Sequence, residues 1–314
     1  MKRITDNDII SLRISPATAV EWVRESFLMK NRSQLPPKVS LHPQGSDFFN
    51  TMPCILPEEY HTFGCKVVSR IAGNHPALKS EMMLFDTHTG EMTALFEANW
   101  ITAMRTGAVA ALAINTLRKS DASTYSFIGL GAMGSASLEC FLATNEGKKI
   151  TVRLKRYKDH AERTIERFSN CDNVKFIIAD SMEQLVAGAD VIVSCITEAK
   201  DLLFPDTSLF KSGVLIVPVH TRGFQNCDTI FDKVIADDEG HVKGFRYFSQ
   251  FRNFRELSDI LAMKSPGRES DTERIISYNI GLGLHDVLFA TKIEQLMNQQ
   301  ITPPHLINFR RHAA

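Results

Sequence analysis

A complete G-x-G-x-x-G in the middle of the chain constrains its fold more than any other feature of the sequence. The motif reads Gly129-Leu130-Gly131-Ala132-Met133-Gly134, with a β-rich run before it and a helical pattern after it. In that order the first glycine permits a tight turn, the second lets a pyrophosphate approach the backbone, and the third permits close packing of helix and strand. The N-terminus of the helix adds free N–H groups and a positive dipole end. Residues 129–134 therefore predict a dinucleotide-binding site.

The sequence beyond the glycine motif has the pattern of a parallel α/β domain. Short apolar runs alternate with helical stretches, as expected for buried strands joined by crossover helices. The predicted strands span residues 123–129, 150–154, 174–178, 190–195 and 213–217. The predicted fold class is therefore α/β, with a Rossmann-type doubly wound sheet.

The residues before the motif have a different, α+β pattern. Ser15-Pro16 suits the N-cap and first position of a helix over residues 17–30. Residues 64–71 are a strand candidate, and residues 82–96 read as a hairpin around Thr89-Gly90. An Ala-rich helix is predicted over residues 102–117.

The C-terminal residues 272–297 have a helical pattern that contains Gly281 and Gly283. Glycine destabilises a helix interior, so these two positions are expected to serve close packing or the approach of a ligand. This helix is expected to return to the N-terminal part. The predicted domains are residues 1–117 with 272–314, and a Rossmann domain at residues 118–271.

Composition argues against several classes of function. The 314 residues include 36 basic and 36 acidic side chains and no Lys/Arg block, which argues against a nucleic-acid partner. No apolar run approaches the roughly 20 residues of a membrane span. Acidic residues stand near the N-terminus, where a signal peptide would be apolar, so a cytoplasmic protein is expected. No Cys/His cluster has zinc-site spacing, and no metal is predicted.

The residues about 20 positions beyond the motif bear on the choice of cofactor, because an NAD site would have an acidic residue there for the ribose 2′-hydroxyl. This chain has Lys155 and Arg156 instead, and no carboxylate before Asp159. A basic pair suits a 2′-phosphate, so NADP(H) is favoured among the NAD(P)(H) cofactors. The alternative is a solvated basic surface at the sheet edge, with NAD(H) as the cofactor.

Three further residues are candidates for chemistry on the pattern alone. Lys66 lies between apolar residues in a strand candidate, where an inward lysine could bind a carboxylate or shift its pKa; the alternative is an exposed lysine. Arg105 lies among small residues and could grip a carboxylate with two hydrogen bonds; the alternative is a surface ion pair. Asp228 follows the last predicted strand, near the edge where doubly wound sheets bind ligands; the alternative is a turn-capping aspartate.

These residues resemble the motifs of the ornithine cyclodeaminase/μ-crystallin family, from about Leu35 to Ala290. The most specific match is the segment around Arg105, which resembles the family's TALRTAA and departs from it at Gly107. The glycine loop also matches. The matching segments are Gly64-Cys65-Lys66 for a G-x-K strand, Leu84-Phe85-Asp86 with Thr89-Gly90 for an LFD…TG hairpin, Thr102-Ala103-Met104-Arg105-Thr106-Gly107-Ala108, and Gly281-Leu282-Gly283-Leu284-His285-Asp286 for a closing G-x-A-x-x-D.

The resemblance implies a role for each residue. Lys66 and Arg105 would hold the α-carboxylate of a substrate, with Lys66 also part of the catalytic site. Lys38 stands where the family often has an arginine that faces the same carboxylate. Thr106 would contact the cofactor phosphates, and Asp228 would be the catalytic acid/base. The implied fold adds an α+β substrate-binding and dimerisation domain to the Rossmann domain, and the implied assembly is a homodimer.

The resemblance also implies hydride transfer between NAD(P)(H) and Cα of a small L-α-amino acid or its imine. The reaction it names first is that of ornithine cyclodeaminase, a lyase that converts ornithine to proline and ammonia. An NADP(H)-dependent imine (ketimine) reductase, amino-acid dehydrogenase or opine-type dehydrogenase is the alternative, which Lys155 and Arg156 favour. A non-catalytic, NADPH-binding protein similar to μ-crystallin is the third hypothesis.

Overall fold

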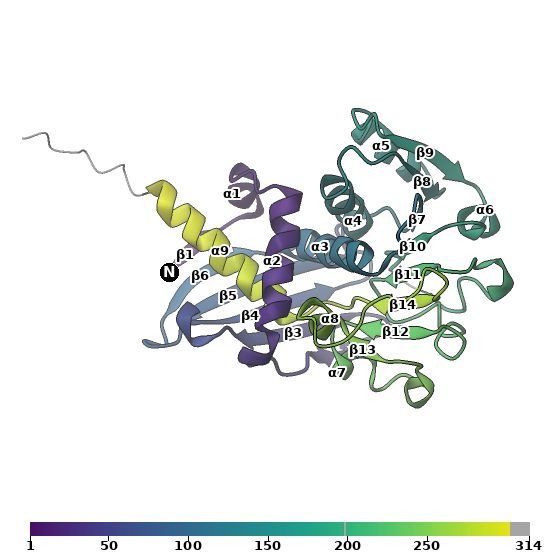
Figure 1. Ribbon diagram of the computed structural model, residues 1–314. Coiled ribbons are helices and arrows are strands. Elements are labelled where there is room, and N and C mark those ends of the chain that lie inside the picture. Colours follow the sequence, from purple (N-terminus) through teal and green to yellow (C-terminus); the bar gives the residue numbers. More distant parts are fainter. Residues whose placement is uncertain (198, 302–314) are drawn as a thin grey trace, which may run out of the picture.

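Two β-sheets lie side by side and divide the molecule into two parts (Figure 1). The computed structural model describes residues 1–197 and 199–301, and within them one sheet has six strands and the other eight. In Figure 1 the first sheet lies at the left beneath long helices, and the second lies at the right among shorter ones.

The first sheet is formed by the N-terminal third of the chain. Its strands are β1 (Lys2–Ile4), β2 (Val39–Leu41), β3 (Phe48–Ile55), β4 (Thr62–Arg70), β5 (Leu78–Asp86) and β6 (Met92–Glu97). The order is β1-β6-β5-β4-β3-β2, antiparallel except for the β1–β6 pair. Side chains alternate between faces along β4, so that Lys66 and Val68 are buried while Cys65 and Val67 are half-buried. Lys66 therefore points into the protein.

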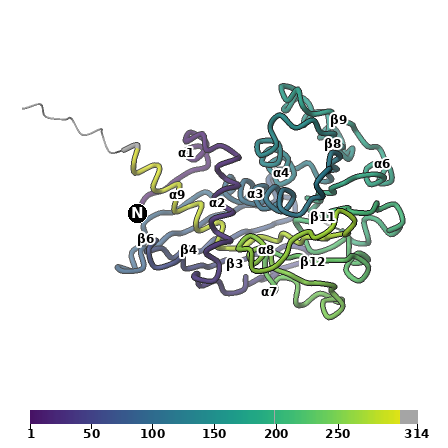
Figure 2. The backbone as a smooth tube through the Cα atoms, in the orientation of Figure 1, coloured from purple at the N-terminus to yellow at the C-terminus, as the bar shows by residue number. Residues whose placement is uncertain are grey.

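Helices pack on one face of the first sheet and on one another. They are α1 (Asp6–Ser11), α2 (Pro16–Met29), α3 (Asn99–Leu117) and α9 (Gly283–Ile301). The predicted start of α2 is confirmed, because Ser15 Oγ accepts a hydrogen bond from Thr18 N and Pro16 is the first helical residue. α2 and α9 lie side by side, so the C-terminal helix returns to the N-terminal part (Figure 2).

The second sheet is parallel throughout and has the Rossmann arrangement. Its strands are β7 (Thr124–Ile128), β8 (Ile150–Lys155), β9 (Val174–Ala179), β10 (Val191–Ser194), β11 (Leu215–Pro218), β12 (Lys233–Ala236), β13 (Arg255–Glu256) and β14 (Ile275–Tyr278). Their order is β13-β12-β14-β11-β10-β7-β8-β9. The chain runs from β7 to β9 on one side and returns to β10 and β11 on the other. The glycine loop after β7 therefore lies at the topological switch point, where doubly wound sheets bind ligands.

Shorter helices connect these strands. They are α4 (Ala132–Ala143), α5 (His160–Arg167), α6 (Met182–Val186), α7 (Glu239–Val242) and α8 (Leu257–Leu261). Single 3₁₀ turns span Lys30–Arg32, Glu58–Tyr60, Thr207–Leu209 and Phe248–Gln250. The α/β fold class with a Rossmann-type sheet is confirmed, and each strand predicted for this sheet is found within two residues of its expected ends.

The prediction of one helix over residues 272–297 is wrong in its first part. Ile275–Tyr278 form β14, a buried strand between β11 and β12, and α9 begins only at Gly283. A short apolar run fits a buried strand as well as a helix segment, and the neighbouring strands decide between them. We therefore propose that the Rossmann part extends through Tyr278 rather than to residue 271. Residues 302–314 of the other predicted domain lie outside the described residues.

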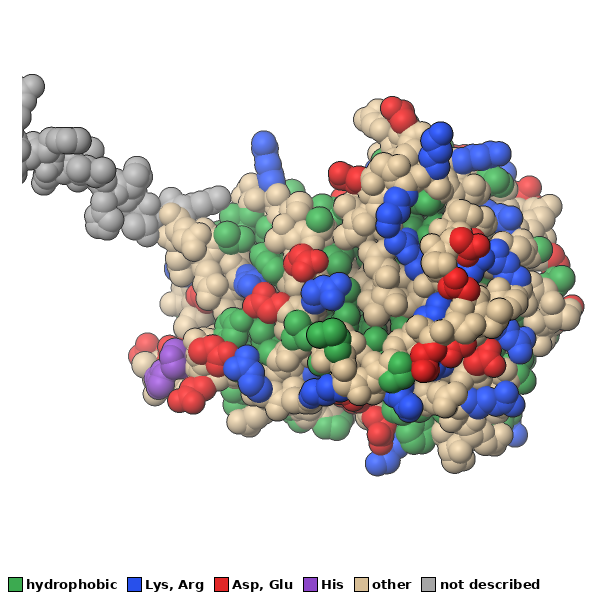
Figure 3. Space-filling model, in the orientation of Figure 1, with side chains coloured by type: hydrophobic (Ala, Val, Ile, Leu, Met, Phe, Trp, Pro, Cys, Tyr) green, Lys and Arg blue, Asp and Glu red, His purple; other side chains and the backbone are tan. Residues whose placement is uncertain are grey.

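The surface combines both signs of charge. On the face shown in Figure 3, basic and acidic side chains are interspersed over both parts of the molecule. Within residues 1–197 and 199–301, no helix is both long and apolar enough to cross a membrane. In the same residues, no group of three or more His, Cys, Asp or Glu side chains is placed to hold a metal ion.

Candidate active site

The glycine loop has the shape that a pyrophosphate site requires. Gly129 has a φ of +85°, and a Cβ there would lie 2.6 Å from the carbonyl carbon of Cys195. A Cβ on Gly134 would lie 2.1 Å from Gly129 O, so strand and helix pack with no space for side chains. A Cβ on Gly131 would meet no described atom within 4 Å, which leaves open space in front of the loop. No described side chain caps α4, so its first N–H groups can bind phosphate.

Lys155 and Arg156 lie at the carboxyl end of β8, on the edge of the sheet that carries the glycine loop. Lys155 Nζ donates to the backbone oxygen of Asp180 at 2.9 Å. Arg156 bonds to the carboxylates of Asp180 and Glu162. The side chains of both basic residues and of both carboxylates reach solvent, so these bonds contribute little to stability and can exchange for other partners.

Three charged side chains from distant parts of the chain meet in the protein interior. Lys66 Nζ donates to Asp286 Oδ1 at 2.6 Å, and Arg105 Nε donates to the same oxygen at 3.0 Å. Lys66 and Asp286 are completely buried, and Arg105 is 5% exposed. The residues come from β4, α3 and the first turn of α9, so the packing of both helices on the first sheet assembles them. We call Lys66, Arg105 and Asp286 the charge cluster.

Gly281 determines where the guanidinium of Arg105 lies. Gly281 has a φ of +96°, and a Cβ there would lie only 1.7 Å from Arg105 Nη1. Its N–H donates to the carboxylate of Asp237, which directly follows β12. A Cβ on Gly283 would lie 3.0 Å from Met52 O. The expectation that these two glycines serve close packing is therefore confirmed, and the segment before α9 connects the charge cluster to the carboxyl edge of the second sheet.

The charge cluster has more positive than negative charge. Burial, reinforced by the Arg105 charge, lowers the pKa of Lys66 to about 7. Burial acts to raise the pKa of Asp286, but the Arg105 and Lys66 charges outweigh it and hold that pKa below its ordinary value. Asp286 Oδ2 has no hydrogen-bond partner among the described residues. An anionic ligand beside Lys66 would favour its charged form and balance the excess.

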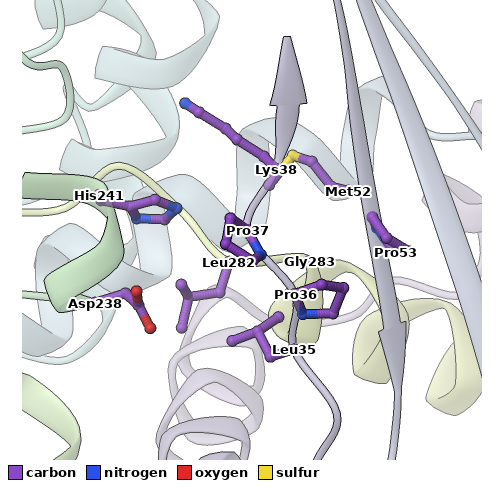
Figure 4. Close-up of a pocket in the computed structure, with 10 residues that line it drawn as sticks. All are labelled: Leu35, Pro36, Pro37, Lys38, Met52, Pro53, Asp238, His241, Leu282 and Gly283. Carbon is purple, nitrogen blue, oxygen red and sulfur yellow. The ribbon is translucent and has the colours of Figure 1, made fainter. Parts of the chain in front are cut away.

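Lys38 lies close enough to the charge cluster for their charges to interact. Burial lowers the pKa of Lys38; Asp237 acts in the opposite direction, and Arg105 lowers it further. Lys38 also lines a small pocket of about 40 Å³ between the two parts of the molecule. Figure 4 shows Lys38 and Met52 on one side of this pocket, and His241 from α7 on the other. The structure thus brings the three predicted carboxylate-binding residues into one region.

Thr106 lies in α3, next to the residue at which α3 crosses α4. Its hydroxyl donates to Thr102 O at 2.7 Å, so a contact with phosphate requires the hydroxyl to rotate. A Cβ on the next residue, Gly107, would lie 2.4 Å from the carbonyl carbon of Ala136 in α4. The close crossing of α3 and α4 therefore explains why glycine replaces the alanine of the family motif.

Asp228 lies apart from the charge cluster. It is completely buried in the loop between β11 and β12, next to the core residues Cys227 and Phe231. Tyr278 Oη donates to its Oδ1 at 2.6 Å, and its Oδ2 has no partner among the described residues. Burial raises the pKa of Asp228 to about 6. No described hydrogen bond or ion pair joins it to the charge cluster.

A larger cavity, of about 420 Å³, lies between the two sheets. We call it the inter-sheet cavity. Arg70, at the end of β4, lines it from the first sheet, and His220, shortly after β11, lines it from the second. His220 Nε2 lies 2.6 Å from Ser194 Oγ, and Arg222 N donates to its Nδ1 at 3.4 Å. Burial lowers the pKa of His220 to about 4, so the ring is neutral at pH 7.

Several residues of these sites are not assigned a role by the sequence patterns. Asp286 belongs to the closing motif, yet the pattern alone shows no partner for it. Asp237 and His220 each follow a buried apolar strand, which is the signal that could have identified them at the carboxyl edge. Ser194 and Arg70 belong to no motif, and only their spatial neighbours draw attention to them.

The comparison with known families decides which fold family these features belong to. Residues 5–300 match the ornithine cyclodeaminase/mu-crystallin family. The chain belongs to this family. The predicted resemblance is therefore confirmed over nearly the whole chain.

Relatives within the ornithine cyclodeaminase/mu-crystallin family are distant in sequence and close in fold. Nodulation efficiency protein NfeD of Rhizobium meliloti is 26% identical over 275 residues, 84% of each chain. A Delta(1)-pyrroline-2-carboxylate reductase of Bacillus thuringiensis is 26% identical over 261 residues, 76% of this chain and 78% of that protein. The solved Delta(1)-pyrroline-2-carboxylate reductase of Thermococcus litoralis, in complex with NADH and L-proline, is 21% identical with a TM-score of 0.84, over 98% of this chain and all of that one.

Proposed function

We propose that this protein is an NAD(P)(H)-dependent enzyme that transfers a hydride between the cofactor and Cα of a small L-α-amino acid or its imine. One observation carries the proposal: a buried charge cluster with excess positive charge is connected, through Gly281 and Asp237, to the carboxyl edge of the Rossmann sheet. An α-carboxylate bound at the cluster would hold Cα near the nicotinamide. Relatives in the family include enzymes of this kind.

The glycine loop fits a dinucleotide, because Gly131 faces open space and no described side chain caps α4. Residues 129–134 would hold the pyrophosphate, and Thr106 would add a hydroxyl. The cofactor would supply the hydride donor or acceptor. The protein's contribution is then to bind the substrate, orient it and move a proton.

We propose NADP(H) as the preferred cofactor, on the basis of Lys155 and Arg156 at the end of β8. Both side chains could turn toward a 2′-phosphate, since their present partners are exposed. Replacement of Arg156 by glutamine should weaken NADPH binding about tenfold and leave NADH binding unchanged. Fluorescence titration of both cofactors measures this; Arg163→Gln, in another exposed ion pair, is the matched control.

Lys66 and Arg105 would bind the α-carboxylate, and Lys38 would add a third positive charge. Arg105 uses Nε for Asp286, which leaves its terminal nitrogens for the ligand. Asp286 would then act as a positioning residue that holds both cations in place. Fixing the carboxylate in this way restricts Cα to one orientation, which is the main contribution that binding makes to hydride transfer.

The reaction also needs a group that exchanges a proton with the substrate nitrogen, and Asp228 remains our proposal for it. Its raised pKa suits proton exchange near neutral pH. His220 is the second candidate, because it lines the inter-sheet cavity while Asp228 is enclosed in the core. Steady-state kinetics of Asp228→Asn and His220→Asn distinguish the two candidates. Loss of the proton carrier should lower kcat by roughly 100-fold or more and leave cofactor affinity unchanged. Unchanged turnover in Asp228→Asn would exclude Asp228 as the proton carrier.

Our first candidate for the reaction is reduction of an imine, or the reverse oxidation of an amino acid, and ornithine cyclodeamination is ranked below it. The family includes cyclodeaminases, so that reaction is the second candidate. Ornithine has a distal ammonium group, however, and the charged side chains described in the inter-sheet cavity are basic. A binding protein without turnover is the third candidate, and the charge cluster argues against it because mere cofactor storage needs no carboxylate site.

One set of assays separates the three candidates. Imine reduction predicts stoichiometric NADPH consumption with a cyclic imine, or with a 2-oxo acid plus an amine. Cyclodeamination predicts proline and ammonia from ornithine with catalytic NAD(P)⁺. Tight NADPH binding without turnover of any of these substrates would contradict both catalytic proposals.

We also propose a homodimer formed through the free face of the first sheet. The face opposite the helices carries a group of apolar side chains that are only half-buried in the single chain, namely Phe63, Cys65, Val67, Met83, Phe85 and Leu95. Burial of such a face against a second copy would be favourable. Sedimentation of the purified chain should give twice the monomer mass, and Val67→Glu should shift it to monomer.

A further inference from the structure

The inter-sheet cavity is large enough for the side chain of a substrate. Its volume of about 420 Å³ falls within the roughly 300–1,000 Å³ that is usual for small-molecule sites. It opens at the carboxyl ends of β10 and β11, next to the switch point where the nicotinamide end of a dinucleotide is expected.

Among the described residues, the positive charge in the cavity comes from two arginines. Arg70 lines it from the first sheet, and Arg222 lines it from the second beside the neutral ring of His220. In the part of the chain that the structure describes, neither arginine forms an ion pair with a carboxylate. Arg70 Nη1 donates to Ser46 O at 3.2 Å, whereas its Nε is shielded from solvent and has no described partner. The guanidinium therefore keeps unused donors for an anion.

Arg70 follows Lys66 by four positions in β4, so the two side chains lie on the same face of the strand. At about 3.3 Å per residue, their Cα atoms are roughly 13 Å apart. Long side chains reach inward from both positions. A substrate with its α-carboxylate at the charge cluster would thus extend its side chain along β4 toward Arg70.

We propose that the substrate carries a second carboxylate, which Arg70 binds in the inter-sheet cavity. The substrate class is then a dicarboxylic α-amino acid and its imine. This inference rests on the proposed function and specifies its substrate. In the reductive direction, a 2-oxo dicarboxylic acid and ammonia condense to the imine with loss of water. The imine carbon then accepts a hydride from NAD(P)H and the nitrogen accepts a proton, which gives the amino acid and NAD(P)⁺.

The test compares acids of equal chain length that differ only in the terminal group. NADPH oxidation is measured with ammonia and either 2-oxoglutarate or 2-oxopentanoate, and with oxaloacetate or 2-oxobutanoate. A site that binds the second carboxylate should give at least about 100-fold higher kcat/KM for the dicarboxylic acid of each pair. Equal or higher kcat/KM for the monocarboxylic acids would overturn the proposal.

The variant Arg70→Gln tests the residue assignment. It should lower kcat/KM for the preferred dicarboxylic acid by about 30-fold, mainly through KM, and leave the monocarboxylic acid within about threefold. Arg246→Gln is the matched control, because Arg246 is exposed and stacks on Tyr247 outside the cavity. Weaker NADPH binding in Arg70→Gln with an unchanged preference for dicarboxylic acids would show that Arg70 faces the cofactor, and would overturn the assignment.

A separate measurement distinguishes failure of this inference from failure of the proposed function. If none of the four acids is reduced, calorimetry measures the binding of 2-oxoglutarate and 2-oxopentanoate to protein saturated with NADP⁺. Tighter binding of 2-oxoglutarate that is lost in Arg70→Gln supports the anion site although the proposed reaction fails. Equal affinities overturn the anion site itself.

Discussion

The glycine loop and the charge cluster are built in opposite ways. The loop is six consecutive residues, and its backbone alone forms the surface that would meet a phosphate. The charge cluster takes single side chains from β4, α3 and α9, and Lys66 and Asp286 are 220 positions apart. The loop is therefore defined by local conformation, whereas the cluster exists only after both helices have packed on the first sheet.

This difference has a consequence for stability. The loop consists of uncharged groups in a favoured turn, so it can persist without its ligand. The cluster contains two cations and one carboxylate in a nearly dry environment, where a missing partner is strongly unfavourable. We expect variants of the loop to affect cofactor binding first, and variants of the cluster to affect both the substrate and the fold.

The largest expected effect is on catalysis at the cluster. Lys66→Met should lower kcat/KM by about 10³-fold, because it removes a charge-assisted contact to the carboxylate that orients Cα. Cofactor affinity should stay unchanged, since Lys66 lies on the other sheet from the glycine loop. Steady-state kinetics and NADPH titration measure the two quantities. Lys175→Met, at an exposed position of β9, is the control. A loss below tenfold in Lys66→Met would contradict the carboxylate-binding role of Lys66.

The second effect is on stability. Asp286→Asn should lower the free energy of unfolding by about 3 kcal/mol, because it leaves Lys66 and Arg105 buried without their shared carboxylate. Urea denaturation measures the change. Glu21→Gln removes one partner of an exposed ion pair with Arg24 and should change stability by less than about 1 kcal/mol. Similar changes in the free energy of unfolding for both variants would mean that Lys66 becomes neutral when Asp286 is removed and that the cluster contributes little to stability.

Two alanine substitutions sharpen the description of the loop. Gly131→Ala should weaken NADPH binding by roughly 30-fold at unchanged thermal stability, because its Cβ enters open space meant for the ligand. Gly134→Ala should weaken binding and also lower the melting temperature, because its Cβ collides with Gly129 O. Calorimetric melting and fluorescence titration separate the two. Equal melting temperatures for both variants would contradict the packing role of Gly134.

The smallest expected effect is on the pH dependence of substrate binding. With the pKa of Lys66 at about 7, the free protein loses the Lys66 proton as the pH rises through 7. An anionic substrate binds the protonated form, so its affinity should fall above pH 7 by up to about tenfold per pH unit. Calorimetric titration between pH 6 and 9 measures the slope. The slope should vanish in Lys66→Met, and its persistence there would assign the titration to another group.

The part of the fold that could be predicted is the part with local signals. Residues 150–154 and 174–178 are apolar runs between helical stretches, and Ser15-Pro16 has the chemistry of a helix start. The strand Ile275–Tyr278 falls within a predicted helix because four residues are too few to show a hydrophobic periodicity. Its position between β11 and β12 depends on pairing partners far away in the chain.

The candidate site divides in the same way. Lys66 and Arg105 could be proposed because they stand in recognisable motifs, and the structure places them on one oxygen of Asp286. Asp228 follows a predicted strand, yet it is completely buried and accepts a hydrogen bond from Tyr278, which sequence spacing cannot show. Its role remains a prediction. His220 is two residues beyond β11, and only the approach of the first sheet encloses it in a cavity.

Patterns within a few residues were sufficient to predict the glycine loop, the parallel strands around it and the family to which the chain belongs. These depend on backbone conformation and on patterns within a few residues, which glycines and apolar periods encode directly. The tertiary structure alone decided that Lys66 and Arg105 share Asp286, that Gly281 makes room for the guanidinium, and that Arg70 faces His220 across a cavity. Those relations depend on how two sheets and their helices pack, because electrostatic and steric contacts act through space and not along the chain.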